Sequence, residues 1–231
     1  LYVVEADAQA NGWTPQAFRL AGDLWYEIGD HYAASAYWER AAVTLTDDSQ
    51  LMRDLAQTYL DLGDYNAAAG ALSRYLALHP AISDENWAAY HLGLIRAAAH
   101  PPPIDYLNLA LREPAYAPII SPVLRVLTAD SSETSRAFDV GIALIGTEQW
   151  SYAELAFDQA VGDPDYAALA LAYMGWTRDM QGEDGGSEIR RAILLAPDDA
   201  RVRFVDGLHQ RALGDNEGSL LAFEQAVALD P

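Results

Sequence analysis

Six small residues recur along the chain at intervals close to 34 residues. They are Gly22, Ala56, Gly93, Gly141, Gly175 and Gly207, and their spacings are 34, 37, 48, 34 and 32 residues. Each is followed by an apolar half-turn, a Gly-Asp-like break and an Ala-rich stretch that usually ends in Pro. Self-similarity at this period is typical of stacked units, none of which buries its apolar face alone. The sequence therefore predicts an elongated array of repeats.

Each repeat is predicted to contain two amphipathic helices. The first helix begins after Thr14-Pro15, an N-cap followed by proline in the first helical position. Its apolar stripe has the i, i+3, i+4, i+7 spacing of a helix face: Phe18, Ala21, Gly22 and Trp25. Gly29-Asp30 ends this helix, and Ala34, Trp38 and Ala41 mark the inner face of the second. The small residue allows the two helices of a pair to approach closely.

This pattern resembles the tetratricopeptide repeat, a 34-residue helix–turn–helix with a small residue in the first helix and a closing Pro. The match is clearest in "AGDLWYEIGDHYAASAYWERA" (21–41), "AQTYLDLGDYNAAAGALSRYLALHP" (56–80) and "GLHQRALGDNEGSLLAFEQAVALDP" (207–231). The resemblance implies an all-α, right-handed solenoid whose first helices line a concave groove.

The repeat register divides the chain into six repeats and one insertion. The predicted segments are the tail of a preceding helix and turn at 1–14, repeats at 15–48, 49–82 and 83–115, an inserted half-repeat helix and connector at 116–133, and repeats at 134–167, 168–199 and 200–231. The insertion accounts for the 48-residue spacing between Gly93 and Gly141, and its residues 119–129 are apolar enough to form one short helix. We expect a kink or a change of superhelical phase there, separating 15–115 from 134–231. The chain starts without Met and ends on a closing Pro, which predicts a piece of a longer protein.

The charge balance narrows the partners that this chain can bind. Asp and Glu number 34 against 14 basic residues, all of them Arg, so the formal net charge is −20. Binding to nucleic acid or to an anionic membrane surface needs clusters of basic residues, and this composition argues against both. No apolar run approaches the roughly 18 residues that cross a bilayer. Any protein partner is expected to present a basic or an apolar surface.

Catalytic and metal-binding motifs are scarce. "GIALIG" (141–146) has the glycine spacing of a phosphate loop without the Lys-Ser/Thr that follows one. "GEDGG" (182–186) lacks the alternating ligands of a calcium loop, and the five His residues stand far apart. Cys is absent, which excludes thiolate chemistry and disulfides. The sequence predicts no enzyme activity, no cofactor and no metal site.

The surface that the repeats leave open is the candidate site. In the repeat register, the residues just outside the packing stripe of each first helix point into the groove. The lining of this groove changes along the chain from polar and charged to apolar and aromatic. The candidate groove residues are Arg19, Tyr26, Arg53, Trp87, Tyr90, Phe138, Ile142, Trp176 and Phe204. Trp, Tyr and Arg dominate protein-binding hot spots, which favours a partner groove. The alternative is that the inserted helix folds into the groove and covers these residues.

Arg19 and Arg53 stand one repeat apart and are expected to face the same way. Some tetratricopeptide proteins hold a peptide carboxylate with a Lys, Asn and Arg set on successive first helices. This chain has no Lys, and Asp23 and Gln57 stand where the Asn residues of that set are expected. A local ion pair with Asp23 or Asp54 is the expected role of these arginines, and the carboxylate clamp is not assigned.

The resemblance and the groove composition predict a scaffold or assembly factor that binds a protein or peptide. Two other classes stay open at this point. One is the regulatory or substrate-binding arm of a larger enzyme. The other is a structural subunit of a homo- or hetero-oligomer, with self-association through the terminal repeat.

Overall fold

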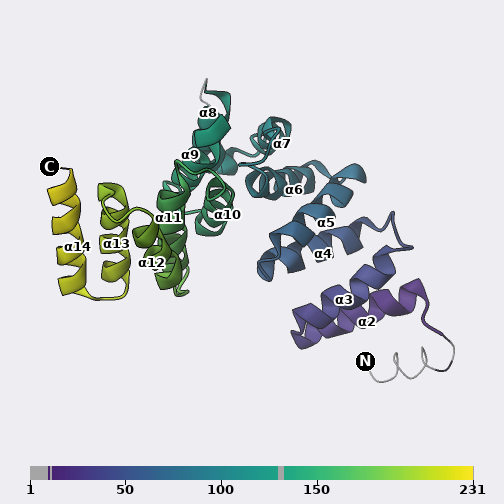
Figure 1. Cartoon of the computed structure of the whole chain (residues 1–231). Helices are drawn as coiled ribbons and strands as arrows, with labels where there is room; N and C mark the ends of the chain where they lie inside the picture. The colour runs from purple at the N-terminus through teal and green to yellow at the C-terminus, as the bar shows by residue number, and fades with distance from the viewer. Residues whose placement is uncertain (1–9, 11, 130–132, 231) are drawn as a thin grey trace. The chain divides into compact units, whose positions relative to one another are not determined.

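The computed structural model describes residue 10 and residues 12–129 and 133–230, and all regular elements among them are helices (Figure 1). The helices are α2 (Pro15–Ile28), α3 (His31–Ala42), α4 (Ser49–Asp61), α5 (Tyr65–Ala77), α6 (Ile82–Ile95), α7 (Ile104–Ala110), η1 (Pro114–Tyr116, a 3₁₀ turn), α8 (Ala117–Thr128), α9 (Glu133–Ile145), α10 (Trp150–Ala160), α11 (Ala167–Met180), α12 (Gly186–Leu195), α13 (Ala200–Ala212) and α14 (Asn216–Leu229). The expected helix tail before residue 11 lies almost wholly outside the described residues, as do the first three residues of the "DSSETS" connector.

The helices pack in consecutive pairs. The pairs are α2 with α3, α4 with α5, α9 with α10, α11 with α12, and α13 with α14. We call the first helix of each pair its A helix and the second its B helix. Successive pairs also touch, as α3 does with α4 and α10 with α11. The prediction of an all-α array of helix pairs is confirmed.

The Gly-Asp breaks form the turn between the A and B helices. Gly29 takes the left-handed conformation at the end of α2, with φ of 88°. The Asp30 side chain then accepts a hydrogen bond from the backbone N–H of Ala33 at 2.9 Å and caps α3. The same two roles recur at Gly63-Asp64 and Gly214-Asp215. Many of the chain's carboxylates are therefore helix caps.

The periodic small residues mark the closest contacts within the pairs. A Cβ atom built on Gly22 would lie 2.3 Å from the Trp38 ring. At the equivalent position of two other pairs, a Cβ would lie 2.5 Å from the ring of Phe157 or Phe223. Each of these glycines therefore faces an aromatic residue of its own B helix, as the spacing predicts.

The insertion is a helix, as the apolar stretch at 119–129 predicts. It is α8, which begins after the η1 turn and buries Ile120, Val123 and Leu127. Its packing partner among the repeat helices is α9.

The chain forms two compact units. The N-terminal unit comprises the residues up to Leu92 together with Asn108–Glu113, and the C-terminal unit comprises Gly93–Leu107 and the residues from Pro114 onward. The division therefore falls within α6 and α7, earlier in the chain than the 116–133 segment where the sequence predicts it. None of the described helices has the length and apolar character needed to span a membrane.

Candidate functional site

The A helices of the N-terminal unit line a polar cavity of about 350 Å³. We call it the N-terminal cavity, and its walls come from α2, α3 and α4. The lining residues are Arg19, Asp23, Tyr26, Glu27, Trp38, Arg53, Asp54 and Gln57. Three of the predicted groove residues therefore meet here: Arg19, Tyr26 and Arg53.

Arg19 is held by carboxylates of its own unit. Its Nη2 lies 2.6 Å from Asp54 Oδ2, and its Nε lies 3.1 Å from Asp23 Oδ1. The indole N–H of Trp38 donates to the same Asp23 oxygen at 2.9 Å. The guanidinium is thus neutralised by Asp23 and Asp54, as the local ion-pair interpretation expects.

Arg53 is bound more loosely than Arg19. Its Nε lies 3.7 Å from Asp84 Oδ1, and its side chain is 41% exposed against 19% for Arg19. The guanidinium carbon lies 5.3 Å from the centre of the Trp87 ring, which is cation–π distance. Two predicted groove residues, Arg53 of α4 and Trp87 of α6, are therefore in contact.

Tyr90 and its neighbour His91 belong to the packed part of α6. Tyr90 is buried, and the His91 ring lies 5.0 Å from the Tyr90 ring and 5.3 Å from that of Trp87. Tyr90 therefore offers little exposed surface to a partner. Burial lowers the pKa of His91 to about 4, against a weaker opposing effect of Asp61.

The buried His91 predicts acid sensitivity of the fold. Between pH 6.5 and about 4, the unfolded chain takes up a proton at His91 and the folded chain does not. Stability is therefore lost as the pH falls through this window, by about 1.4 kcal/mol per pH unit. Urea unfolding at several pH values measures it. The stability gap between wild type and His91→Gln should narrow on acidification. A gap that stays constant with pH would contradict the prediction.

The C-terminal unit carries an apolar cavity of about 400 Å³, which we call the C-terminal cavity. It extends across the three A helices α9, α11 and α13 and is closed on one side by the end of α14. The lining residues are Phe138, Leu169, Tyr173, Ala200, Arg201, Phe204, Ala226, Val227 and Asp230. Of the predicted groove residues, Phe138 and Phe204 line this cavity.

Aromatic contacts fix the walls of the C-terminal cavity. The Tyr173 ring stacks on Phe157 at 5.4 Å and meets Phe138 at 5.7 Å. Phe204 lies 5.4 Å from Phe223 of α14. Phe138 is 8% exposed, whereas Phe204 is 47% exposed. The cavity thus has a packed aromatic floor and an exposed aromatic rim.

The other two groove residues predicted in this unit lie outside the cavity. The Trp176 ring contacts Trp150 at 5.6 Å, and Ile142 is 37% exposed. Helix α8 contributes no lining residue, so the alternative of a groove filled by the inserted helix has no counterpart at this cavity.

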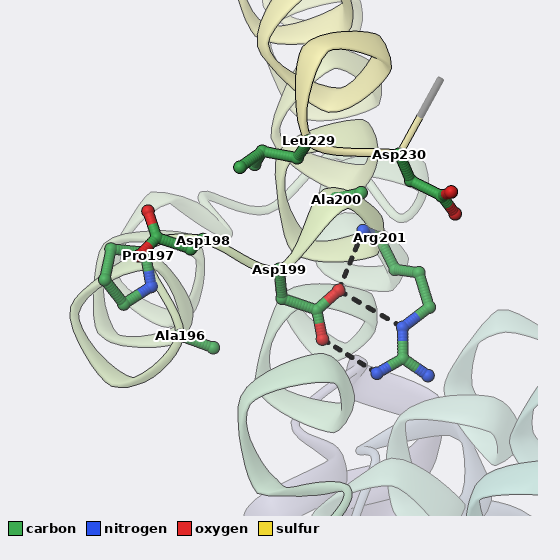
Figure 2. Close-up of a pocket in the computed structure, with 8 residues that line it drawn as sticks. All are labelled: Ala196, Pro197, Asp198, Asp199, Ala200, Arg201, Leu229 and Asp230. Carbon is green, nitrogen blue, oxygen red and sulfur yellow. Dashed lines mark hydrogen bonds and ion pairs between the residues drawn. The ribbon is translucent and has the colours of Figure 1, made fainter.

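Three lining residues of the C-terminal cavity also line a second cavity of about 540 Å³, which we call the acidic cavity. Its lining comprises Ala196, Pro197, Asp198, Asp199, Ala200, Arg201, Leu229 and Asp230 (Figure 2). The Asp199 carboxylate accepts from the Arg201 guanidinium at 2.7 and 3.1 Å and from the Arg201 backbone N–H at 2.8 Å. These hydrogen bonds hold the pKa of Asp199 below its usual range.

Sequence reasoning missed Asp54, Tyr173, Arg201, Val227 and Asp230 as lining residues. Asp54 and Tyr173 occupy the same place in their repeats, two residues before Ala56 and Gly175. Among the described residues, no group of three or more His, Cys, Asp or Glu side chains is arranged to hold a metal ion.

Comparisons with known proteins find likeness in structure. No protein-family model matches the chain, and no curated protein matches it significantly. The MamA protein of Desulfovibrio magneticus RS-1, from residue 41 to its end, is 15% identical with a TM-score of 0.35 and 94% of each chain covered. The P58(IPK) TPR domain is 13% identical with a TM-score of 0.45, covering 100% of this chain and 63% of that one. A tetratricopeptide repeat protein of Parabacteroides merdae ATCC 43184 is 14% identical with a TM-score of 0.39, covering 100% and 85%.

Identities and TM-scores this low say nothing about a shared partner. The fold itself is recognised from the chain's own features: paired helices, Gly-Asp turns and, in three of the pairs, a glycine facing an aromatic ring. The chain has the all-α fold of a tetratricopeptide-repeat protein.

Proposed function

We propose that the chain is a protein-binding scaffold whose partner docks on the exposed faces of the A helices. The observation that carries this proposal is the C-terminal cavity, where three A helices and α14 present an apolar, partly exposed aromatic surface. Concave apolar surfaces lined by aromatic side chains are common at binding sites. Its aromatic residues, Phe204 above all, are suited to act as hot spots.

The N-terminal cavity supports the same proposal from the other unit. It too is lined mainly by A-helix residues, with Tyr26 at 37% exposure and Arg53 stacked on Trp87. Its charges are largely paired, so it contributes polar contacts and orientation more than apolar burial.

Site-specific photocrosslinking in cells of the source organism tests this function. A benzophenone amino acid replaces Tyr26 or Phe204 at the cavities, and Tyr32 or Leu194 at control positions. The controls lie on B helices and are 73% and 82% exposed. We expect protein adducts from the cavity positions and not from the controls. No adducts at positions 26 and 204, or equal adducts at all four, would contradict the proposal.

A further inference from the structure

The C-terminal cavity and the acidic cavity adjoin each other. Ala200, Arg201 and Asp230 line both of them. The apolar part ends at Phe204 and Val227, which are 47% and 64% exposed. A ligand that fills the apolar cavity therefore extends naturally past Arg201 into the acidic one.

The acidic part has an uncompensated negative charge. Three carboxylates line it together with the guanidinium of Arg201, which is engaged by Asp199, and a second guanidinium, that of Arg203, donates to the carbonyl oxygen of the lining residue Pro197 at 3.1 Å. Asp198 and Asp230 are exposed and make no ion pair among the residues that the structure describes. Figure 2 shows the Asp199–Arg201 pair between them, with the side chains of Leu229 and Asp230 pointing in opposite directions. This end of the surface is complementary to a cation.

The two parts together specify the chemistry of the occupant. The apolar cavity, of about 400 Å³, lies at the small end of the range for ligand pockets of about 300–1,000 Å³ and suits one or two large side chains. Nucleic acid and anionic lipid are disfavoured because their phosphates would meet Asp198 and Asp230. A protein segment supplies an apolar anchor and a cation within a few residues.

We infer that this surface binds a protein segment in which a large apolar side chain is followed closely by basic side chains. The anchor occupies the C-terminal cavity against Phe138, Tyr173 and Phe204. The basic side chains lie over Asp198 and Asp230. This inference rests on the proposed function and adds the place and chemistry of one docking site.

Binding of short synthetic peptides to the whole chain tests the inference. One peptide has a single Phe followed by two Arg in a Gly/Ser sequence. Three relatives carry two Gln or two Asp in place of Arg, or Ser in place of Phe. Binding is measured by fluorescence anisotropy at about 0.15 M salt. At this ionic strength, charges more than about 8 Å from the peptide are largely screened. We expect the Phe-Arg peptide to bind at least about tenfold more tightly than the Phe-Asp and Ser-Arg peptides.

Variants distinguish the effect of Asp198 and Asp230 on peptide binding from the effect of the chain's net charge of −20. Asp198→Asn with Asp230→Asn should abolish the preference for Arg over Gln and leave binding of the Phe-Gln peptide unchanged. The matched control is Asp47→Asn with Asp158→Asn, which changes the net charge equally at two exposed sites elsewhere. Phe204→Ser should weaken all Phe peptides alike, with thermal unfolding showing that the variant is folded.

Three results would overturn the inference: no binding of the Phe-Arg peptide, equal binding of the Arg and Asp peptides, or an equal effect of the control variant. The crosslinking experiment keeps this failure distinct from failure of the proposed function. Adducts at Phe204 whose partner segment lacks basic residues would contradict the inference and leave the scaffold function standing. An absence of adducts at both cavity positions would contradict the scaffold function itself.

Discussion

Gly185→Ala is expected to lower the free energy of unfolding by about 3 kcal/mol, the upper end of the usual cost of overpacking. A Cβ on Gly185 would lie 1.9 Å from the carbonyl oxygen of Gly175 and 2.8 Å from its Cα. These are backbone atoms of α11, so no side-chain rotation relieves the overlap. The φ of Gly185 is −87°, which alanine adopts freely, so the effect is steric alone.

The overlap arises because this repeat is two residues shorter than the repeat before it. The shortened turn brings the start of α12 into backbone contact with α11, where three other pairs place an aromatic ring against the small residue. The Gly185 N–H also donates to Asp179 Oδ1 at 3.1 Å, a contact that displacement of the turn would stretch.

Gly70→Ala is the matched control for Gly185→Ala. Gly70 lies inside α5, and a Cβ there would meet nothing within 4 Å. Because alanine loses less entropy in a helix than glycine, this variant should gain roughly 0.5–1 kcal/mol. Urea unfolding followed by circular dichroism measures both midpoints. A wild-type midpoint for Gly185→Ala would contradict the predicted backbone contact.

The helix pairs and their turns could be predicted because their causes are local in sequence. Gly29 and Asp30 stop one helix and cap the next through contacts within a few residues. The 34-residue spacing then places Gly22 opposite Trp38 by the same register that places Gly207 opposite Phe223. Because the same spacing recurs in several repeats, each repeat supports the same predicted arrangement of its two helices.

Part of the site was missed although the sequence carried a signal for it. Residues i and i+4 share a helix face. Leu169 lines the C-terminal cavity and shares a helix face with Tyr173, and Gln50 shares a helix face with Asp54, to which it donates at 2.7 Å. Val227 and Asp230 had no such signal, because they reach the cavity from a B helix through tertiary packing.

The division into two compact units also depends on tertiary packing. The sequence marks the insertion at 116–133 clearly, and the structure places the division inside α6 between Leu92 and Gly93. An inserted helix disturbs the repeat count, but it packs on α9 and stays within the C-terminal unit. Disturbed periodicity therefore located the extra helix and not the division between units.

Asp179→Ala is expected to lower the free energy of unfolding by at least about 3 kcal/mol, as removal of one member of a buried pair commonly does. Asp179 Oδ2 lies 2.6 Å from His209 Nδ1, and the two side chains are 2% and 6% exposed. Through its second oxygen Asp179 also holds the N–H of Gly185.

The expected loss is local because Asp179 joins three consecutive helices. It lies near the end of α11, binds the residue before α12 and pairs with α13. Amide hydrogen exchange should therefore accelerate in α12 and α13 of the variant and stay unchanged in α4 and α5 of the other unit. Uniform acceleration over both units, or none, would contradict this role.

A double-mutant cycle separates the pair from the space that its side chains fill. If Asp179 and His209 act through each other, Asp179→Ala with His209→Ala should cost clearly less than the sum of the two single losses. Arg112→Ala is the control. The Arg112 side chain is 62% exposed, and its Nη1 lies 3.5 Å from Glu85 Oε2. Its removal should lower the free energy of unfolding by less than about 1 kcal/mol. Additive losses at 179 and 209 would show that burial, and not the hydrogen bond between them, carries the stability.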